Sequence, residues 1–102
     1  MTYNQILEAA ATVLLFPGVW IQDHYALDDT GQPVGFSQIE DLACSVCAIG
    51  AVSAYLQHKT MTHPMFYDMA AKLGAPVVLL NDNCETAEQA ASLLLLFDAM
   101  LH

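Results

Sequence analysis

Two cysteines, Cys44 and Cys47, stand three residues apart in a stretch that is otherwise almost wholly apolar. On a helix, positions i and i+3 share a face, so the two thiols could chelate a metal ion as in structural zinc sites. The side chains that could complete such a site are His24, His58, His63 and Cys84. Because the sequence has no second Cys-x-x-Cys and no His-x3-His, and unpaired cysteine is usually buried, we expect core packing. Cys44 and Cys47 remain weak metal candidates, and no cofactor is expected.

The expected position of this pair also disfavours redox chemistry. Cys-x-x-Cys oxidoreductases place the pair at a helix N-terminus after a strand, where the thiol pKa is lowered. Here the pair is expected to lie a full turn or more inside a helix. We expect all three cysteines of the chain to be reduced thiols.

The densest polar cluster of the sequence runs from Asn81 to Thr86. It precedes a predicted helix N-terminus, where free backbone N–H groups can bind an anion. The same residue types are typical of any turn that ends in a helix cap. Two interpretations therefore stay open: a structural turn, or a ligand or partner contact made by Asn81, Asp82 and Glu85.

A third interpretation of this cluster is catalytic. Cys84 would be a nucleophile activated by the helix dipole, with His24 or His63 as its base. The neighbouring carboxylates of Asp82 and Glu85 oppose the formation of a thiolate. We therefore expect no catalytic residue, and the chain is more readily a binding protein than an enzyme.

A second candidate cluster surrounds the single tryptophan, in the segment from Trp20 to Tyr25. On a strand, Trp20 and His24 face one way while Asp23 faces the other, so Asp23 and His24 would not form an acid–base dyad. One face would then pack on the helices, anchored by Trp20, and the other would contact a partner. We take Trp20, Asp23 and His24 as candidate binding residues.

Composition limits the class of partner. The chain has 102 residues, of which 56% are hydrophobic and 13% are charged, which excludes intrinsic disorder and predicts one domain, residues 1–102. The formal net charge is −9, with two lysines and no arginine. A protein that neutralises phosphates is therefore excluded, and we expect no direct nucleic-acid binding. The negative field would steer the chain toward a protein partner with a basic surface.

Hydrophobic periodicity and capping patterns predict the elements that position these residues. Capping boxes at Thr2-x-x-Gln5, Ser37-x-x-Glu40 and Thr86-x-x-Gln89 open three helices. The first helix ends before Pro17-Gly18, the second runs from Gln38 to about His58, and the last ends near Met100. A shorter helix follows Thr62-His63-Pro64 and ends at Gly74.

The remaining segments are shorter. Val19 to Phe36 is predicted to be a two-stranded hairpin around the turn Asp28-Asp29-Thr30-Gly31, and Pro76 to Leu80 is a short strand or a buried connector. In the long central helix, Gly50 is expected to permit the close approach of another backbone. The predicted fold class is mainly α, with about four helices and a small β-hairpin in a single compact domain.

The last predicted helix contains Leu93-Leu94-Leu95-Leu96-Phe97 and is therefore apolar on every side. A chain of this size cannot enclose two such helices, so we expect a homo-oligomer that associates through the last one. The longest uncharged run, residues 42–58, is shorter than a membrane span needs. The first residues lack the positive charge of a signal peptide, so a cytoplasmic protein without a membrane partner is expected.

Several short motifs occur in a familiar order. They are Gly18-Val19-Trp20, Gly31, Cys47-Ala48-Ile49-Gly50-Ala51, and an Asn81-Asp82 turn that leads through Thr86 to Leu96-Phe97-Asp98. In these motifs the chain resembles a family of small bacterial and phage proteins of uncharacterised function. Family members usually carry tryptophan where this chain has Leu80, arginine where it has Glu85, and often a paired cysteine where Val46 stands. The resemblance implies a bacterial or phage origin and a shared fold, and no mechanism.

These observations lead to one functional hypothesis and two alternatives. The hypothesis is a non-enzymatic, acidic interaction protein that inhibits or modulates a host protein. The first alternative is a small-ligand-binding module that uses the N-terminus of the last helix. The second is a metal- or cysteine-dependent enzyme.

Overall fold

The computed structural model describes residues 2–56 and 63–101. Its elements in chain order are α1 (Tyr3–Leu14), β1 (Ala26–Leu27), the 3₁₀ helix η1 (Phe36–Gln38), α2 (Ile39–Leu42), β2 (Ser45–Val46), α3 (Ala48–Leu56), α4 (Pro64–Leu73), α5 (Val77–Asp82) and α6 (Ala87–Met100). In these ranges four helices have nine residues or more, and the two strands form a small antiparallel sheet. The predicted fold class is confirmed.

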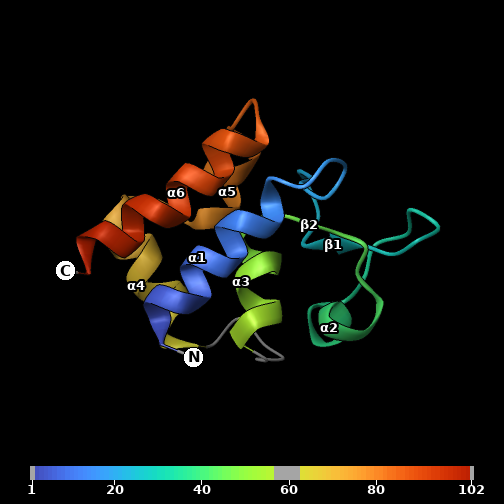
Figure 1. Ribbon diagram of the computed structural model, residues 1–102, viewed down its shortest axis with the longest axis horizontal. Coiled ribbons are helices and arrows are strands. Elements are labelled where there is room, and N and C mark those ends of the chain that lie inside the picture. Colours follow the sequence, from blue (N-terminus) through green and yellow to red (C-terminus); the bar gives the residue numbers. More distant parts are fainter. Residues whose placement is uncertain (1, 57–62, 102) are drawn as a thin grey trace.

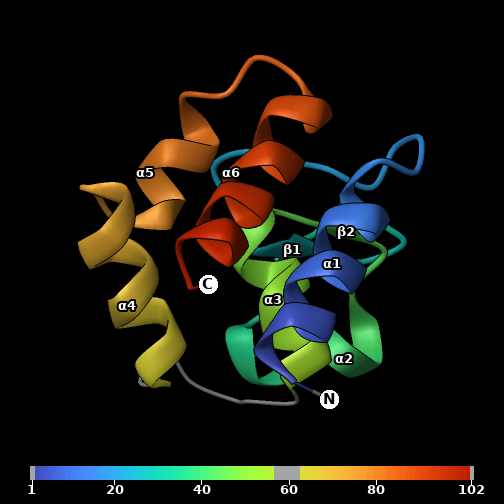
Figure 2. The same cartoon turned by 60° about the vertical axis from the view of Figure 1, so that its left-hand side comes forward.

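The core lies between α1, α3, α4 and α6. In Figure 1, α1 lies against both α6 and α3, with α4 at one end of the molecule and the small sheet with α2 at the other. The largest fully buried apolar side chains are Leu7, Leu14, Ile49, Val52, Met65, Met69, Leu94 and Phe97. Figure 2 shows α4 and α5 beside each other along one side. The long central helix predicted from the sequence corresponds only in part to α3, whose residues 48–53 are all buried.

Two of the three predicted helix caps are present. Thr2 and Gln5 form a complete capping box at α1. At α6 the Thr86 side chain accepts from the Gln89 N–H over 3.2 Å, but the Gln89 side chain accepts from the backbone of Glu85, one residue before the cap. Both arrangements satisfy N–H groups that a helix start leaves without intrahelical partners.

The predicted single helix from Gln38 to about His58 is wrong. Helix α2 has four residues, lacks a side-chain cap at Gln38, and is separated from α3 by β2, so the predicted Ser37 capping box is wrong as well. The backbone N–H of Cys44 instead donates to the carbonyl of Leu27 over 2.8 Å. Tertiary pairing with a distant segment has overridden a local helical pattern. His58 lies outside the described residues.

The predicted hairpin within residues 19–36 is confirmed over a short stretch around the turn at residues 28–31. Leu27 pairs antiparallel with Pro33, and the Val34 N–H donates to the Ala26 carbonyl over 3.0 Å. The named sheet also has a partner that lies outside the predicted hairpin. β1 pairs with β2, with Ala26 opposite Val46 and Leu27 opposite Ser45. On its other side Val46 accepts from Ile21 N–H at 3.1 Å and donates to Val19 O at 2.8 Å. A two-stranded hairpin is marginal by itself, and placing Val46 between two segments adds backbone pairing that an isolated hairpin would lack.

The apolar segment after Gly74 is a helix rather than a strand or connector. Gly74 ends α4 in the left-handed conformation, with φ 84°, as predicted. Pro76 then begins α5, and its carbonyl accepts from the N–H groups of Leu79 and Leu80. Proline suits this start because it has no N–H to leave unpaired. No helix in the described ranges is long and apolar enough to cross a membrane.

Candidate functional site

The two polar clusters of the sequence meet at the side chain of Asn81. Its Oδ1 accepts from the Trp20 indole N–H at 2.8 Å and from the Ala48 backbone N–H at 3.0 Å. Its Nδ2 donates to the carbonyl of Ile21 at 3.1 Å. Asn81 is 0% exposed, so it has no surface for a partner to touch. Its role in the site is to hold the Trp20 segment, α3 and α5 together.

The residues after Asn81 hold the next part of the same segment. The Gln22 side chain donates to the backbone carbonyls of Asp82 and Cys84, at 2.8 and 2.7 Å. The Asp82 carboxylate accepts from the Asp23 backbone N–H at 2.9 Å. Asp23 has φ 70°, a left-handed conformation that aspartate tolerates better than most residues and that still costs energy. The last residue of α5 therefore fixes the backbone of Asp23 in an unusual conformation.

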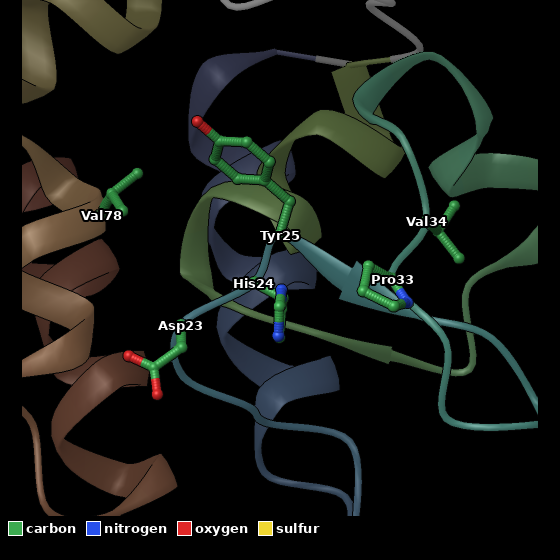
Figure 3. A pocket seen from close by; sticks show the side chains of 6 residues that line it. All are labelled: Asp23, His24, Tyr25, Pro33, Val34 and Val78. Carbon is green, nitrogen blue, oxygen red and sulfur yellow. The ribbon is translucent and has the colours of Figure 1, made fainter.

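Asp23 and His24 form part of the wall of a shallow pocket of about 300 Å³. The lining residues are Asp23, His24, Tyr25, Pro33, Val34 and Val78. In Figure 3, Asp23 and Val78 lie on one side, Pro33 and Val34 lie on the other, and His24 and Tyr25 lie between them. Among the residues that the structure describes, the lining combines one carboxylate and one imidazole with a tyrosine, a proline and two valines, and it contains no lysine. Such a surface can bind a group that is partly apolar and partly cationic.

The backbone of this pocket rests closely on α3. A Cβ atom at Gly50 would overlap the carbonyl oxygen of Tyr25, which also accepts from the Cys47 N–H at 3.0 Å. The predicted close approach at Gly50 is thus confirmed, and the approaching backbone is that of Tyr25. Glycine at this position allows the wall of the pocket to lie directly on the first turn of α3.

Cys44 and Cys47 do not lie within a helix, so that expectation is wrong. They flank β2, and Cys47 directly precedes α3, where its Sγ accepts from the Gly50 N–H at 3.4 Å. Because extended chain rises about 3.3 Å per residue, their Cα atoms are about 10 Å apart, beyond disulfide reach. A position just before a helix lowers the pKa of a thiol, but burial raises the pKa of the Cys47 thiol above its ordinary value. Cys44 is exposed and Cys47 is buried.

The other candidate ligands and nucleophiles are dispersed. In the part of the chain that the structure describes, no group of three His, Cys, Asp or Glu side chains could hold a metal ion. The Cys84 thiol donates to the Leu80 carbonyl at 3.2 Å, and burial raises its pKa. His63 caps α4, its Nδ1 accepting from the Met65 N–H at 3.1 Å. The neutral thiol is therefore the form of Cys84 that its surroundings favour.

Comparison with known families gives a match. The model of a family of unknown function, DUF6197, matches residues 1–95. The chain belongs to this family. Neither the curated proteins nor the solved structures give a match. The expected membership in a family of uncharacterised function is confirmed, while the motif-level details and the bacterial or phage origin stay predictions.

Several residues of this DUF6197 site, among them Gln22, Pro33 and Val78, are not singled out by the sequence. Gln22 lies inside the polar segment from Trp20 to Tyr25. The length of its side chain, which reaches the carbonyls of Asp82 and Cys84, is the signal that could have indicated its role. Pro33 follows the predicted turn at residues 28–31, which returns the chain to β1. Val78 could not be placed, because its segment was not expected to be a helix. Glu85, a predicted contact, is exposed beside the start of α6.

Proposed function

We propose that this DUF6197 protein is a non-enzymatic interaction protein that binds a partner with a basic surface at the pocket of Asp23 and His24. The observation that carries the proposal is the left-handed backbone of Asp23, fixed by the carboxylate of Asp82 at the edge of the pocket. Unfavourable conformations that the surrounding structure maintains are concentrated at binding and switch sites. On the family resemblance, we further propose a bacterial or phage origin. We also propose a cytoplasmic location and a host protein as the partner.

Charge supports a cationic partner. The formal net charge of −9 gives the whole chain a negative field, and the described residues of the pocket lining add a carboxylate and no lysine. Such a field accelerates association with basic surfaces and weakens as salt is added, because the screening length is about 10 Å at 0.1 M. The same field opposes an anionic ligand at the start of α6, where Glu85 and Glu88 stand.

A matched pair of variants tests the proposal. Asp23→Asn removes the carboxylate and keeps a residue that tolerates a left-handed backbone, while Asp29→Asn removes one charge from an exposed position in the turn at 28–31. Each changes the formal net charge from −9 to −8. In pull-downs from host lysate at low salt, Asp23→Asn should lose a partner that Asp29→Asn retains. Equal capture by both variants, or no partner at low salt, would overturn the proposal.

A second proposal concerns association with further copies of the chain. The outer face of α6 exposes Leu95, Leu96 and Met100, at 46%, 49% and 44%. Adjacent exposed apolar side chains on one helix favour association. Native mass spectrometry should give an oligomer that Leu95→Ser with Leu96→Ser converts to a monomer. Leu42→Ser, at a side chain of similar exposure on α2, should leave the oligomer intact. A wild-type monomer would contradict this proposal.

A further inference from the structure

A second, mostly apolar pocket adjoins the pocket of Asp23 and His24. It has a volume of about 210 Å³ and lies between α3, α4 and α5. Its lining residues are Ile49, Phe66, Tyr67, Ala70, Pro76, Val77 and Val78. Tyr67 is 64% exposed at its edge, so an incoming side chain would cover apolar surface that water now contacts.

Val78 lines both pockets and therefore joins them. It belongs to the first turn of α5 and faces the Tyr25 side of the first pocket in Figure 3. The next residue, Leu79, is 57% exposed. An apolar depression and a depression that carries the Asp23 carboxylate are thus separated by one side chain.

We propose that the two pockets form one docking surface for a protein segment that carries a lysine or arginine close to a bulky apolar side chain. The cation would lie beside Asp23, and the apolar side chain would fill the pocket between α4 and α5. The acidic half rests on the function proposed above, whereas the apolar half is independent of it. A buried apolar anchor beside a charge-complementary rim is the usual anatomy of a protein interface.

Charge favours a basic protein segment over two other occupants, a second copy of the chain and an anionic membrane surface. At this surface, unlike the apolar outer face of α6, a second copy of the chain would bring its net charge of −9 beside the Asp23 carboxylate. An anionic membrane surface would be repelled for the same reason. A basic protein segment gains from the carboxylate and from the apolar pocket together.

The probe is a random dodecapeptide phage library, selected on the full immobilised chain. Enriched peptides should place a lysine or arginine within about four residues of Leu, Ile, Phe or Trp, a separation that lets one segment reach both pockets. In the best synthetic peptide, alanine at either position should raise the Kd roughly tenfold or more. Enrichment of purely apolar or acidic peptides, or no enrichment, would overturn the inference.

Variants on α4 test the apolar half by itself. Ala70→Leu fills the pocket, and Ala71→Leu makes the same change at the next, exposed position of the same helix. Ala70→Leu should weaken peptide binding roughly tenfold, and Ala71→Leu should not. Tyr67→Ser changes an exposed position at the edge of the pocket and should also weaken binding. This variant provides an independent test if circular dichroism shows that Ala70→Leu does not fold.

The outcomes separate the two proposals. If Asp23→Asn weakens peptide binding while both leucine variants bind like the wild type, the apolar half is overturned and the proposed function stands. If Ala70→Leu weakens binding and Asp23→Asn does not, the cationic half and the proposed function fail. If Ala70→Leu instead converts an oligomer to a monomer, the occupant is a second copy and the inference is wrong.

Discussion

The indole N–H of Trp20 donates to the side-chain oxygen of Asn81 over 2.8 Å, across 61 positions of the chain. The sequence makes both residues candidates for contact with a partner, but in the structure their side chains form a hydrogen bond with each other. The bond fixes the segment that carries Asp23 against α5. We therefore expect direct contact with a partner at the exposed residues Asp23 and His24 of the same segment.

Replacing Asn81 should be the most damaging polar substitution at the site. Asn81→Leu leaves the Trp20 and Ala48 N–H groups and the Ile21 carbonyl without their partner. The free energy of unfolding should fall by about 3 kcal/mol, since each buried polar group left unpaired costs about 1–3 kcal/mol. Urea denaturation, followed by the emission of Trp20, measures this loss. Asn83→Leu, at an exposed position of the same turn, is the control and should change stability little.

Gly50 should not accept even one methyl group. Gly50→Ala places Cβ against the Tyr25 carbonyl, and backbone atoms cannot rotate away as a side chain can. We expect the free energy of unfolding to fall by about 1–3 kcal/mol, although alanine is the better helix former by about 1 kcal/mol. Thermal unfolding checks this against Gly35→Ala, where the added Cβ would lie 4.0 Å from the Gln38 side-chain oxygen, an ordinary contact, at φ −64°. Equal melting temperatures would show that α3 can move away from Tyr25.

The backbone of Asp23 predicts which substitutions this position accepts. Asp23→Val should lower the free energy of unfolding by about 1–2 kcal/mol, because a β-branched residue disfavours the left-handed region. Asp23→Gly, which accepts that region freely, should stay within about 0.5 kcal/mol of the wild type. Chemical denaturation of the two variants side by side gives the difference. Comparable loss in both would assign the cost to the missing carboxylate.

Cys47 should make the fold sensitive to alkaline pH. Burial raises the pKa of this thiol in the folded chain, so the folded state holds its proton more tightly than the unfolded state. The stabilisation is present in full below the thiol pKa of the unfolded chain, about 8.5, and is lost as pH rises toward the folded value. Urea midpoints at pH 8 and pH 10 should therefore differ more in the wild type than in Cys47→Ala. An equal difference in both would contradict the assignment to this thiol.

The sequence predicted best what depends on neighbouring residues. The caps at Thr2 and Thr86, the stop at Gly74 and the turn at 28–31 are local patterns, and each is present. Gly50 was informative because a glycine inside a helical pattern needs a packing reason. Local rules succeed where the competing interactions lie within about four residues.

The strand pairing could not be predicted for the opposite reason. Ser45 and Val46 stand in a strongly helical pattern, and their conformation is decided by distant backbone groups. Val46 bonds to Val19 and Ile21, and the flanking Cys44 and Cys47 bond to Leu27 and Tyr25. The candidate site shows the same limit. Both polar clusters were recognised from their residue types, but their contact depends on where α5 lies. That helix has only six residues, Val77–Asp82, and its four apolar residues are part of a segment too short to be recognised as a helix.

The shared acceptor at Asn81 has a consequence for motion. One oxygen receives both the Trp20 indole and the first amide of α3, so neither group can detach without disturbing the bond geometry of the other. The loop after α1, the start of α3 and the end of α5 should therefore open as one cooperative unit. Native-state hydrogen exchange at the Ile21 and Ala48 amides would then share a single opening free energy, and a basic ligand at Asp23 would protect both amides without touching either.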